Sequence, residues 1–146
     1  MVAIILEMQG KPAEAQRVYE QVVAAHPRAA VAANNLAWMH AERGVDLDLA
    51  LQLAQAAKQE LPNAPEVNDT LGWIYYRKDL ATLAVPALES AVHADPKNAS
   101  FSYHLGLAYG KTRDVARAAR AFDEAVKLKP DFREAIDARA ALKTQK

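Results

Sequence analysis

Four prolines recur along the chain at almost constant intervals, with spacings of 35, 34 and 34 residues between Pro27, Pro62, Pro96 and Pro130. Columns of small and apolar residues follow the same period. These columns are Ala15, Ala50, Ala84 and Ala118; Tyr19, Ala54, Leu88 and Phe122; and Val22, Ala57, Ala91 and Ala125. Independent columns that share one period of a few tens of residues are typical of arrays in which each repeat packs on its neighbours. We therefore expect a linear array of similar repeats.

Each period contains two amphipathic helical patterns. Leu71 and Tyr75 lie four residues apart on one face of the first helix, and Leu88 and Ala91 share one face of the second. The proline after each second helix cannot continue the hydrogen-bond ladder and marks a boundary. The pattern predicts helices over residues 2–9, 11–25, 29–43, 47–60, 64–78, 80–93, 98–111, 114–128 and 132–144.

The helices of a pair are expected to approach closely and to be joined by tight turns. Gly72 and Gly106 permit the close approach, because a larger side chain would hold the backbones apart. The turns use Gly10 and Gly44 in the first half of the chain. In the second half, Asp79 and Arg113 stand at the corresponding positions. We expect a left-handed backbone at all four turn residues.

Helix starts carry capping candidates, and one helix contains a proline. We expect Asn63, Asn98 and Asp131 to cap the helices that follow them. Pro86 falls inside the predicted helix 80–93. It should either kink that helix or push its start to a later residue.

The repeated columns resemble those of the tetratricopeptide repeat family: Leu-Gly followed by Tyr in the first helix, then Ala, a large apolar residue, Ala and a closing Pro. The resemblance implies an all-α, right-handed α-solenoid of helix-turn-helix repeats. It covers about the whole chain. It divides the chain into a partial repeat at 1–29, full repeats at 30–64, 65–98 and 99–132, and a C-terminal capping helix at 132–146.

The two ends of the array differ. In the last helix, Phe132, Ile136 and Leu142 are expected to face inward and to cap the array. The N-terminal segment exposes an apolar face, so we expect the chain to be the C-terminal part of a longer array. The alternative is a short protein that forms a homodimer through this face. The face consists of Val2, Ile4, Ile5 and Leu6.

A narrower resemblance concerns three short strings of the first helices. Residues 34–38, 69–75 and 103–106 are similar to the terminal repeats of bacterial lipoproteins of exopolysaccharide export and exosortase (PEP-CTERM) systems. This resemblance leaves open a cytoplasmic location and a periplasmic or outer-membrane location through a parent chain.

The family resemblance implies that the first helices line a concave surface that binds a partner. Trp38 and Trp73 occupy one column of adjacent repeats, where they either line the groove or pack between repeats. Asn34, Asn35 and Asp69 either bond a peptide backbone or brace neighbouring helices. The candidate contact residues are Asn34, Asn35, Trp38, Asp69, Thr70, Trp73, Tyr76, Arg77, Tyr103, His104, Leu107 and Lys111.

Several classes of function are not favoured. The chain has 18 Lys and Arg against 18 Asp and Glu, so it lacks the basic excess typical of nucleic-acid binding. It contains no cysteine, and no apolar run approaches the length of a membrane span. The four histidines form no metal-binding motif, and no serine lies in a nucleophile elbow. We expect no cofactor, no metal, no membrane insertion and no catalysis.

Three functions remain from this sequence. The leading one is a non-catalytic scaffold that binds a protein or peptide segment in the concave groove. The alternatives are carbohydrate recognition on the Trp, Tyr, Asn and Asp face, and a purely architectural segment. Binding of a chaperone C-terminus is not favoured, because Asp69 lies in the column that would meet the terminal carboxylate.

Overall fold

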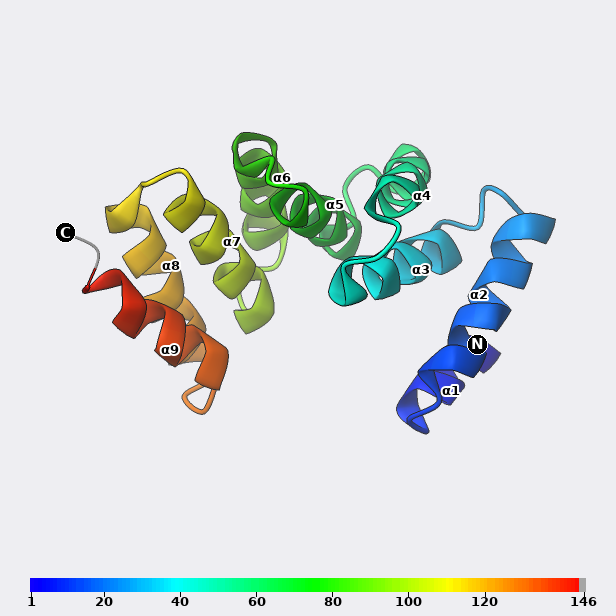
Figure 1. Cartoon of the computed structure of the whole chain (residues 1–146), viewed down its shortest axis with the longest axis horizontal. Coiled ribbons are helices and arrows are strands. Elements are labelled where there is room, and N and C mark those ends of the chain that lie inside the picture. Colours follow the sequence, from blue (N-terminus) through cyan, green and yellow to red (C-terminus); the bar gives the residue numbers. More distant parts are fainter. Residues whose placement is uncertain (145–146) are drawn as a thin grey trace. The chain divides into compact units, whose positions relative to one another are not determined.

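The computed structural model describes residues 1–144, in which the chain forms nine α-helices and no strand (Figure 1). The predicted all-α fold is confirmed, and each helix begins and ends within two residues of its expected bounds. The helices are α1 (Val2–Met8), α2 (Pro12–Ala25), α3 (Ala30–Arg43), α4 (Leu47–Glu60), α5 (Pro65–Arg77), α6 (Ala81–Ala94), α7 (Ala99–Lys111), α8 (Val115–Leu128) and α9 (Arg133–Leu142).

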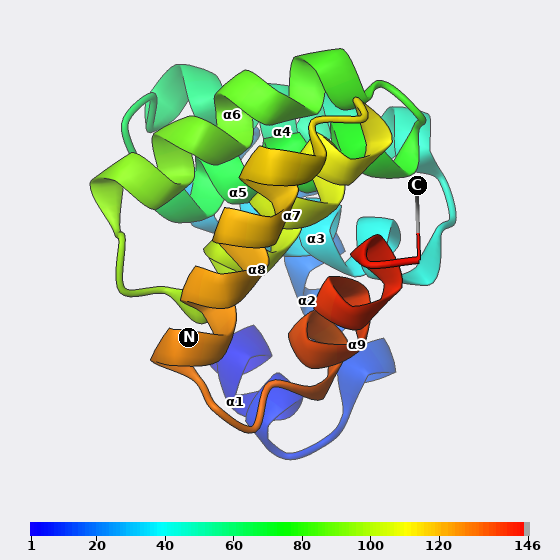
Figure 2. The ribbon, with the colours of Figure 1, turned by 90° about the vertical axis from the view of Figure 1, so that its left-hand side faces the viewer.

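The chain divides into two compact units, which we call the N-terminal unit (Met1–Pro62) and the C-terminal unit (from Asn63 onward). In the N-terminal unit, α1 packs on α2, α2 on α3 and α3 on α4. In the C-terminal unit, successive helices from α5 to α9 pack on each other, and α7 also touches α5 and α9 (Figure 2). Helix α7 is therefore the central element of the C-terminal unit.

The main core of the C-terminal unit lies between α6, α7 and α8. Its buried members are Ala84, Leu88, Leu105, Ala108, Tyr109, Ala118, Phe122 and Leu142. Tyr75 is half-buried against this cluster, and Tyr109 belongs to it. The predicted helix faces are thus the faces that this unit buries.

Glycine in the first helix of a pair allows the second helix to come close. A Cβ built on Gly72 would lie 2.5 Å from Cγ of Leu88, and one built on Gly106 would lie 2.5 Å from Cε1 of Phe122. Leu88 and Phe122 are buried, so neither side chain can easily move aside. The prediction of close approach at these two glycines is confirmed.

The turns within the helix pairs have the predicted left-handed backbone. The φ angle is 73° at Gly10 and 66° at Gly44, and it is 64° at both Asp79 and Arg113. Asp46, just before α4, also has a positive φ of 49°, which the sequence patterns had not indicated.

One of the predicted caps is observed and two are not. The side chain of Asn98 accepts a hydrogen bond from the backbone N–H of Phe101 at 3.2 Å. Asn63 and Asp131 do not cap, because α5 and α9 each begin one residue later than such a cap requires. Ala64 and Phe132 therefore take the N-cap positions, and neither gives a side-chain cap.

Helix α6 runs through its internal proline. It begins at Ala81, ahead of Pro86, so the expectation of a later start is wrong. Proline lacks the N–H that would reach the carbonyl of Thr82, one turn earlier. The remaining hydrogen bonds of the helix and its buried face at Ala84, Leu88 and Ala91 are sufficient to hold the helix together.

The two terminal helices differ in how much apolar surface they cover. In α9, Leu142 is buried and Ile136 is half-buried, as expected of the capping helix, and Phe132 at its N-cap is buried too. In α1, Ala3 is the buried residue, while Val2, Ile4, Ile5 and Met8 are exposed. Among residues 1–144, no helix has the length and apolar character that crossing a membrane requires.

Candidate functional site

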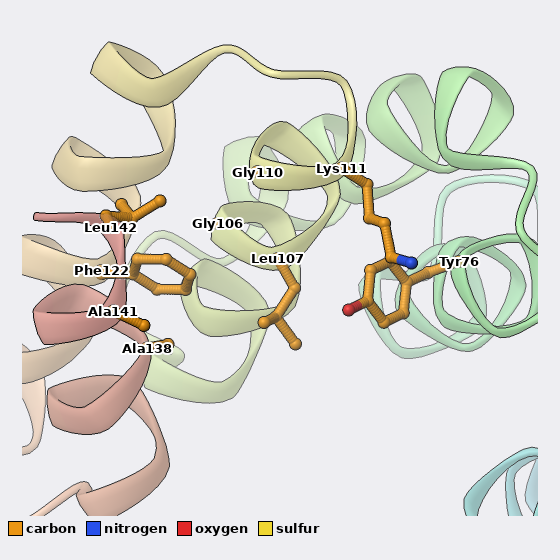
Figure 3. A pocket seen from close by; sticks show the side chains of 9 residues that line it. All are labelled: Tyr76, Gly106, Leu107, Gly110, Lys111, Phe122, Ala138, Ala141 and Leu142. Atoms are coloured by element: carbon orange, nitrogen blue, oxygen red, sulfur yellow. The ribbon is translucent and has the colours of Figure 1, made fainter. Parts of the chain in front are cut away.

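A pocket of about 240 Å³ opens on α7 of the C-terminal unit, between α5 on one side and α9 on the other (Figure 3). We call it the α7–α9 pocket. It is lined by Tyr76, Gly106, Leu107, Gly110, Lys111, Phe122, Ala138, Ala141 and Leu142. Figure 3 shows Tyr76 and Lys111 on one side of Leu107, and Phe122, Ala138, Ala141 and Leu142 on the other.

Small residues keep this pocket open. Gly110 follows Gly106 by one helical turn on α7, so both lie on the same side of that helix. The space beside Gly106 is filled by Phe122, whereas a Cβ on Gly110 would meet no atom within 4 Å beyond its own stretch of helix. On the opposite wall, α9 offers the short side chains of Ala138 and Ala141. The free space therefore lies over Gly110.

Among residues 1–144, Lys111 is the one charged residue in the lining of this pocket. Its Nζ lies 5.9 Å from the centre of the Tyr76 ring and 3.4 Å from Oδ1 of Asp79. The Lys111 and Asp79 side chains are 51% and 84% exposed. An ion pair that is so exposed contributes little to stability, because water screens it. A ligand carboxylate can therefore compete with Asp79 for the ammonium group.

A row of aromatic rings runs from Tyr76, which lines the pocket, along α5 and α7 to the start of α9. The ring of Tyr76 stacks on Trp73 at 5.2 Å, and Trp73 lies 4.5 Å from the ring of His104. The row continues from His104 to Tyr103 at 5.8 Å and from Tyr103 to Phe132 at 5.0 Å. These contacts hold three helices of the C-terminal unit in register.

A buried polar contact joins α5 to α7 within this row. Nδ1 of His104 lies 2.8 Å from Oδ1 of Asp69, and both side chains are buried. A carboxylate can only accept, so the imidazole N–H donates. Burial raises the pKa of the Asp69 carboxyl above its usual value, and the hydrogen bond from His104 partly offsets this rise.

The predicted contact residues of the C-terminal unit fall into three groups. Tyr76, Leu107 and Lys111 line the α7–α9 pocket. Arg77 is exposed above Trp73, and Tyr103 is half-buried. The others are covered by the fold, which leaves little of their surface for a ligand. They are Asp69, Thr70, Trp73 and His104.

Two of these buried residues have the structural roles that were the alternatives to ligand contact: Asp69 braces α5 against α7, and Trp73 packs against α7. Asp69 holds His104, as described above, and the hydroxyl of Thr70 donates to the backbone carbonyl of Glu66 at 2.9 Å. Trp73 is 8% exposed and packs on Tyr76 and His104.

The predicted residues of the N-terminal unit lie on α3. Asn34 is buried, while Asn35 and Trp38 are half-buried. The side-chain amide of Asn35 donates to the hydroxyl of Tyr19 at 3.1 Å, so it braces α3 against α2. Trp38 belongs to the N-terminal unit and Trp73 to the C-terminal unit, and a groove that uses both stays a prediction.

Sequence patterns missed the two glycines of α7 and the part of the lining that comes from α8 and α9. The missed residues are Gly106, Gly110, Phe122, Ala138, Ala141 and Leu142. The family resemblance directed attention to the first helices alone. The available signal was the repeated spacing of small residues, Gly106 with Gly110 and Ala138 with Ala141, on two helices expected to pack together.

The ionisable side chains and the α7–α9 pocket differ in how accessible they are. Among residues 1–144, no group of three or more His, Cys, Asp or Glu side chains comes together as a metal site. The Asp69–His104 contact is enclosed by aromatic rings, with His104 only 7% exposed. The α7–α9 pocket, by contrast, is open, mostly apolar and provided with one cation.

Comparison with known proteins gives consistent results for family and fold. The family model described as tetratricopeptide repeat matches residues 3–65 and 70–131. The search of curated protein sequences gives no match.

Several solved structures are similar in fold. MamA from Desulfovibrio magneticus RS-1 has a TM-score of 0.80 and 22% identity, with 99% of this chain and 81% of that chain covered. MamA MSR-1 has a TM-score of 0.78 and 26% identity, with 98% and 82% covered. The first tetratricopeptide domain of human RPAP3 has a TM-score of 0.73 and 16% identity, with 80% and 91% covered. These likenesses show the fold.

Proposed function

Because the chain belongs to the tetratricopeptide repeat family, whose members bind protein or peptide partners, we propose that it is a non-catalytic scaffold for a segment of a partner protein. The proposed binding surface is the face formed in the C-terminal unit by the first helices of the repeats at 65–98 and 99–132, α5 and α7. The observation that carries the proposal is the α7–α9 pocket, which is open, mostly apolar and lined in part by the predicted residues Tyr76, Leu107 and Lys111.

Peptide binding fits this pocket better than binding of a free small molecule. Pockets for drug-sized ligands usually enclose about 300–1,000 Å³. The α7–α9 pocket encloses about 240 Å³, which suits one or two side chains of a longer segment. The remainder of such a segment would lie along α7, near Tyr103 and Arg77.

The two alternative functions have less support. Carbohydrate recognition would use exposed aromatic rings and exposed polar side chains. On the proposed face, the Trp73 ring is only 8% exposed and the Asp69 carboxylate residue only 4% exposed. Screening the chain on a glycan array tests this alternative, and binding to glycans in the absence of peptide binding would favour it. An architectural segment would bind neither peptides nor glycans.

A random peptide library displayed on phage tests the scaffold proposal. The full chain is the bait, and binders to the Gly110→Leu variant are removed, since that change fills the space over Gly110. We expect enriched peptides whose addition shifts NMR amide resonances on α5, α7 and α9. Failure to enrich any peptide would contradict the proposal. So would amide resonance shifts confined to the side of α8 that faces away from the α7–α9 pocket.

Self-association through α1 is a separate proposal. It rests on the exposed side chains of Val2, Ile4, Ile5 and Met8, which an aqueous monomer leaves in contact with water. Sedimentation equilibrium over a hundredfold range of concentration measures it. A mass that stays at that of one chain would exclude the dimer.

A further inference from the structure

The chemistry of the α7–α9 pocket indicates which kind of peptide it would hold. In the part of the chain that the structure describes, Lys111 is the one lining residue that carries a charge, and no acidic side chain belongs to the lining. The lining includes the apolar side chains of Leu107, Phe122 and Leu142. An apolar side chain gains by leaving water for such a site, whereas a charged one would lose its hydration.

The position of the free space limits which side chain can enter. It lies over Gly110, where a Cβ would meet no atom within 4 Å, and between the short side chains of Ala138 and Ala141 and the larger Leu107. A Leu, Ile, Met or Phe side chain of a partner would contact these residues from above α7. A serine or alanine would leave most of the space empty and gain less.

The positive charge of Lys111 at the edge of the pocket determines which residue of the partner segment can lie beside that apolar side chain. Nζ of Lys111 stands beside the Tyr76 ring at the edge of the pocket away from α9 (Figure 3). Its existing partner, Asp79, is 84% exposed at the side chain and 3.4 Å away. An acidic group of the ligand that replaces Asp79 would bond the ammonium at the border of an apolar surface, where charge-assisted hydrogen bonds are stronger.

We infer that the α7–α9 pocket holds a large apolar side chain of a partner segment in which an acidic residue lies one or two positions away and pairs with Lys111. This inference rests on the proposed scaffold function and names the chemistry of the segment. The acidic group is a side chain within the segment, so the segment need not end at the pocket.

Four fluorescein-labelled peptides of twelve residues test the inference. They share a Gly-Ser framework and differ in a central Leu or Ser and in flanking Glu or Lys residues. Fluorescence anisotropy with the full chain should rank the Leu–Glu peptide first. Replacing either Leu by Ser or Glu by Lys should weaken binding about tenfold or more, the loss expected for one buried apolar group or one charged hydrogen bond.

Two variants connect these preferences to the pocket. Gly110→Leu should remove the advantage of Leu over Ser, because the new side chain occupies the same space. Lys111→Glu should reverse the preference between Glu and Lys in the peptide. The matched control is Lys127→Glu, which makes the same charge reversal on an exposed residue of α8 outside the lining. Circular dichroism melting of each variant verifies that it is folded.

The outcomes separate the inference from the function on which it rests. If library peptides bind but show no preference for apolar and acidic residues, the inference is wrong and the scaffold proposal stands. The same conclusion follows if Lys111→Glu leaves the Glu preference unchanged. If neither the library nor the four peptides bind, both the inference and the proposed function are wrong.

Discussion

The two units solve the same packing problem with different residues. In the C-terminal unit, a glycine on the first helix faces a large side chain on the second, as Gly72 faces Leu88 and Gly106 faces Phe122. In the corresponding columns of the N-terminal unit stand Ala37 and Ala54, both fully buried. Helix approach in this repeat therefore depends on the combined size of two columns, and neither column alone determines it.

The units also differ in their polar layer and in their terminal helix. In the C-terminal unit, Asp69 and His104 bond to each other and α9 covers the end. The residue equivalent to Asp69 in the N-terminal unit is Asn34, whose buried Oδ1 accepts no hydrogen bond in the part of the chain described, and α1 leaves much of its apolar surface exposed. The equivalent polar column thus forms a buried contact between two helices in the unit that carries the pocket.

The largest expected effect comes from breaking the pairing of Gly72 with Leu88. Leu88→Ala should lower the free energy of unfolding by about 2–5 kcal/mol, because it leaves a cavity in a fully buried site. Gly72→Ala alone should also destabilise, since its Cβ would collide with Leu88.

In the double variant the sign should change. With Leu88 shortened, the Cβ of Ala at position 72 no longer collides with that side chain, and its remaining near neighbour is the Ala84 carbonyl oxygen at 3.3 Å. Gly72→Ala should therefore stabilise the Leu88→Ala protein. The pair then resembles Ala37 and Ala54. Urea unfolding of the four proteins, followed by far-ultraviolet circular dichroism, measures this coupling. Additive effects would contradict the comparison of the units.

A smaller effect is expected from methyl groups added to α7. Gly106→Ala should cost about 1–3 kcal/mol, because Phe122 must move from a buried position. Gly110→Ala is the matched control on the same helix. Its Cβ meets open space, so it should stabilise by up to about 1 kcal/mol through helix propensity. Thermal melts should place the two variants on opposite sides of the wild type.

Exchanging a helix cap between the units should change stability by about 1 kcal/mol in each direction. Asn98→Ala removes the side chain that accepts from the Phe101 N–H, and should destabilise α7. Ala29 takes the equivalent N-cap position before α3 and gives no side-chain hydrogen bond. Ala29→Asn should stabilise the N-terminal unit. Hydrogen exchange at the first amides of α3 and α7 assigns each change to its unit, and equal protection in variant and wild type would contradict it.

The smallest expected effect is a dependence of the free energy of unfolding on pH, which arises from Asp69 in the C-terminal unit. The folded-state pKa of Asp69 lies above its unfolded value near 3.9, so between these values the folded state binds more protons. The free energy of unfolding should therefore fall as pH rises from about 4 through the folded-state pKa. Asp69→Asn should remove this loss, giving the C-terminal unit the neutral polar layer that Asn34 provides in the N-terminal unit.

Urea unfolding from pH 4 to pH 7 in a Trp38→Phe background measures the slope, with Trp73 as the remaining indole. Asp137→Asn is the control, since it removes a carboxyl that is 64% exposed. Parallel pH profiles for the wild type and Asp69→Asn would contradict the expected contribution of this carboxyl.

Most of the fold was predictable because the repeated sequence pattern reflects local conformational preferences. Proline positions, the apolar periodicity and the turn residues at 10, 44, 79 and 113 depend on the backbone of a few neighbouring residues. The caps at Asn63 and Asp131 were mispredicted for the same local reason. A shift of one residue in the helix start moves the N-cap to Ala64 or Phe132, and the sequence patterns do not determine the start that finely.

The candidate site was less predictable because it depends on tertiary contacts between helices that are far apart in the sequence. Tyr76, Leu107 and Lys111 could be identified from their columns alone. The burial of Asp69 and His104 depends on their contact across α5 and α7, thirty-five residues apart in sequence. The far wall of the α7–α9 pocket depends on how α9 packs, and a short helix without the repeat pattern has no column to predict its contacts.

The aromatic row makes changes in the C-terminal unit observable in NMR spectra. Rings separated by about 6 Å or less shift one another's proton resonances, and the row contains Tyr76, Trp73, His104, Tyr103 and Phe132. One end of the row lines the pocket and the other stands at the first turn of α9. A molecule that tilts the Tyr76 ring would therefore leave a trail of chemical-shift changes on side chains that it never touches.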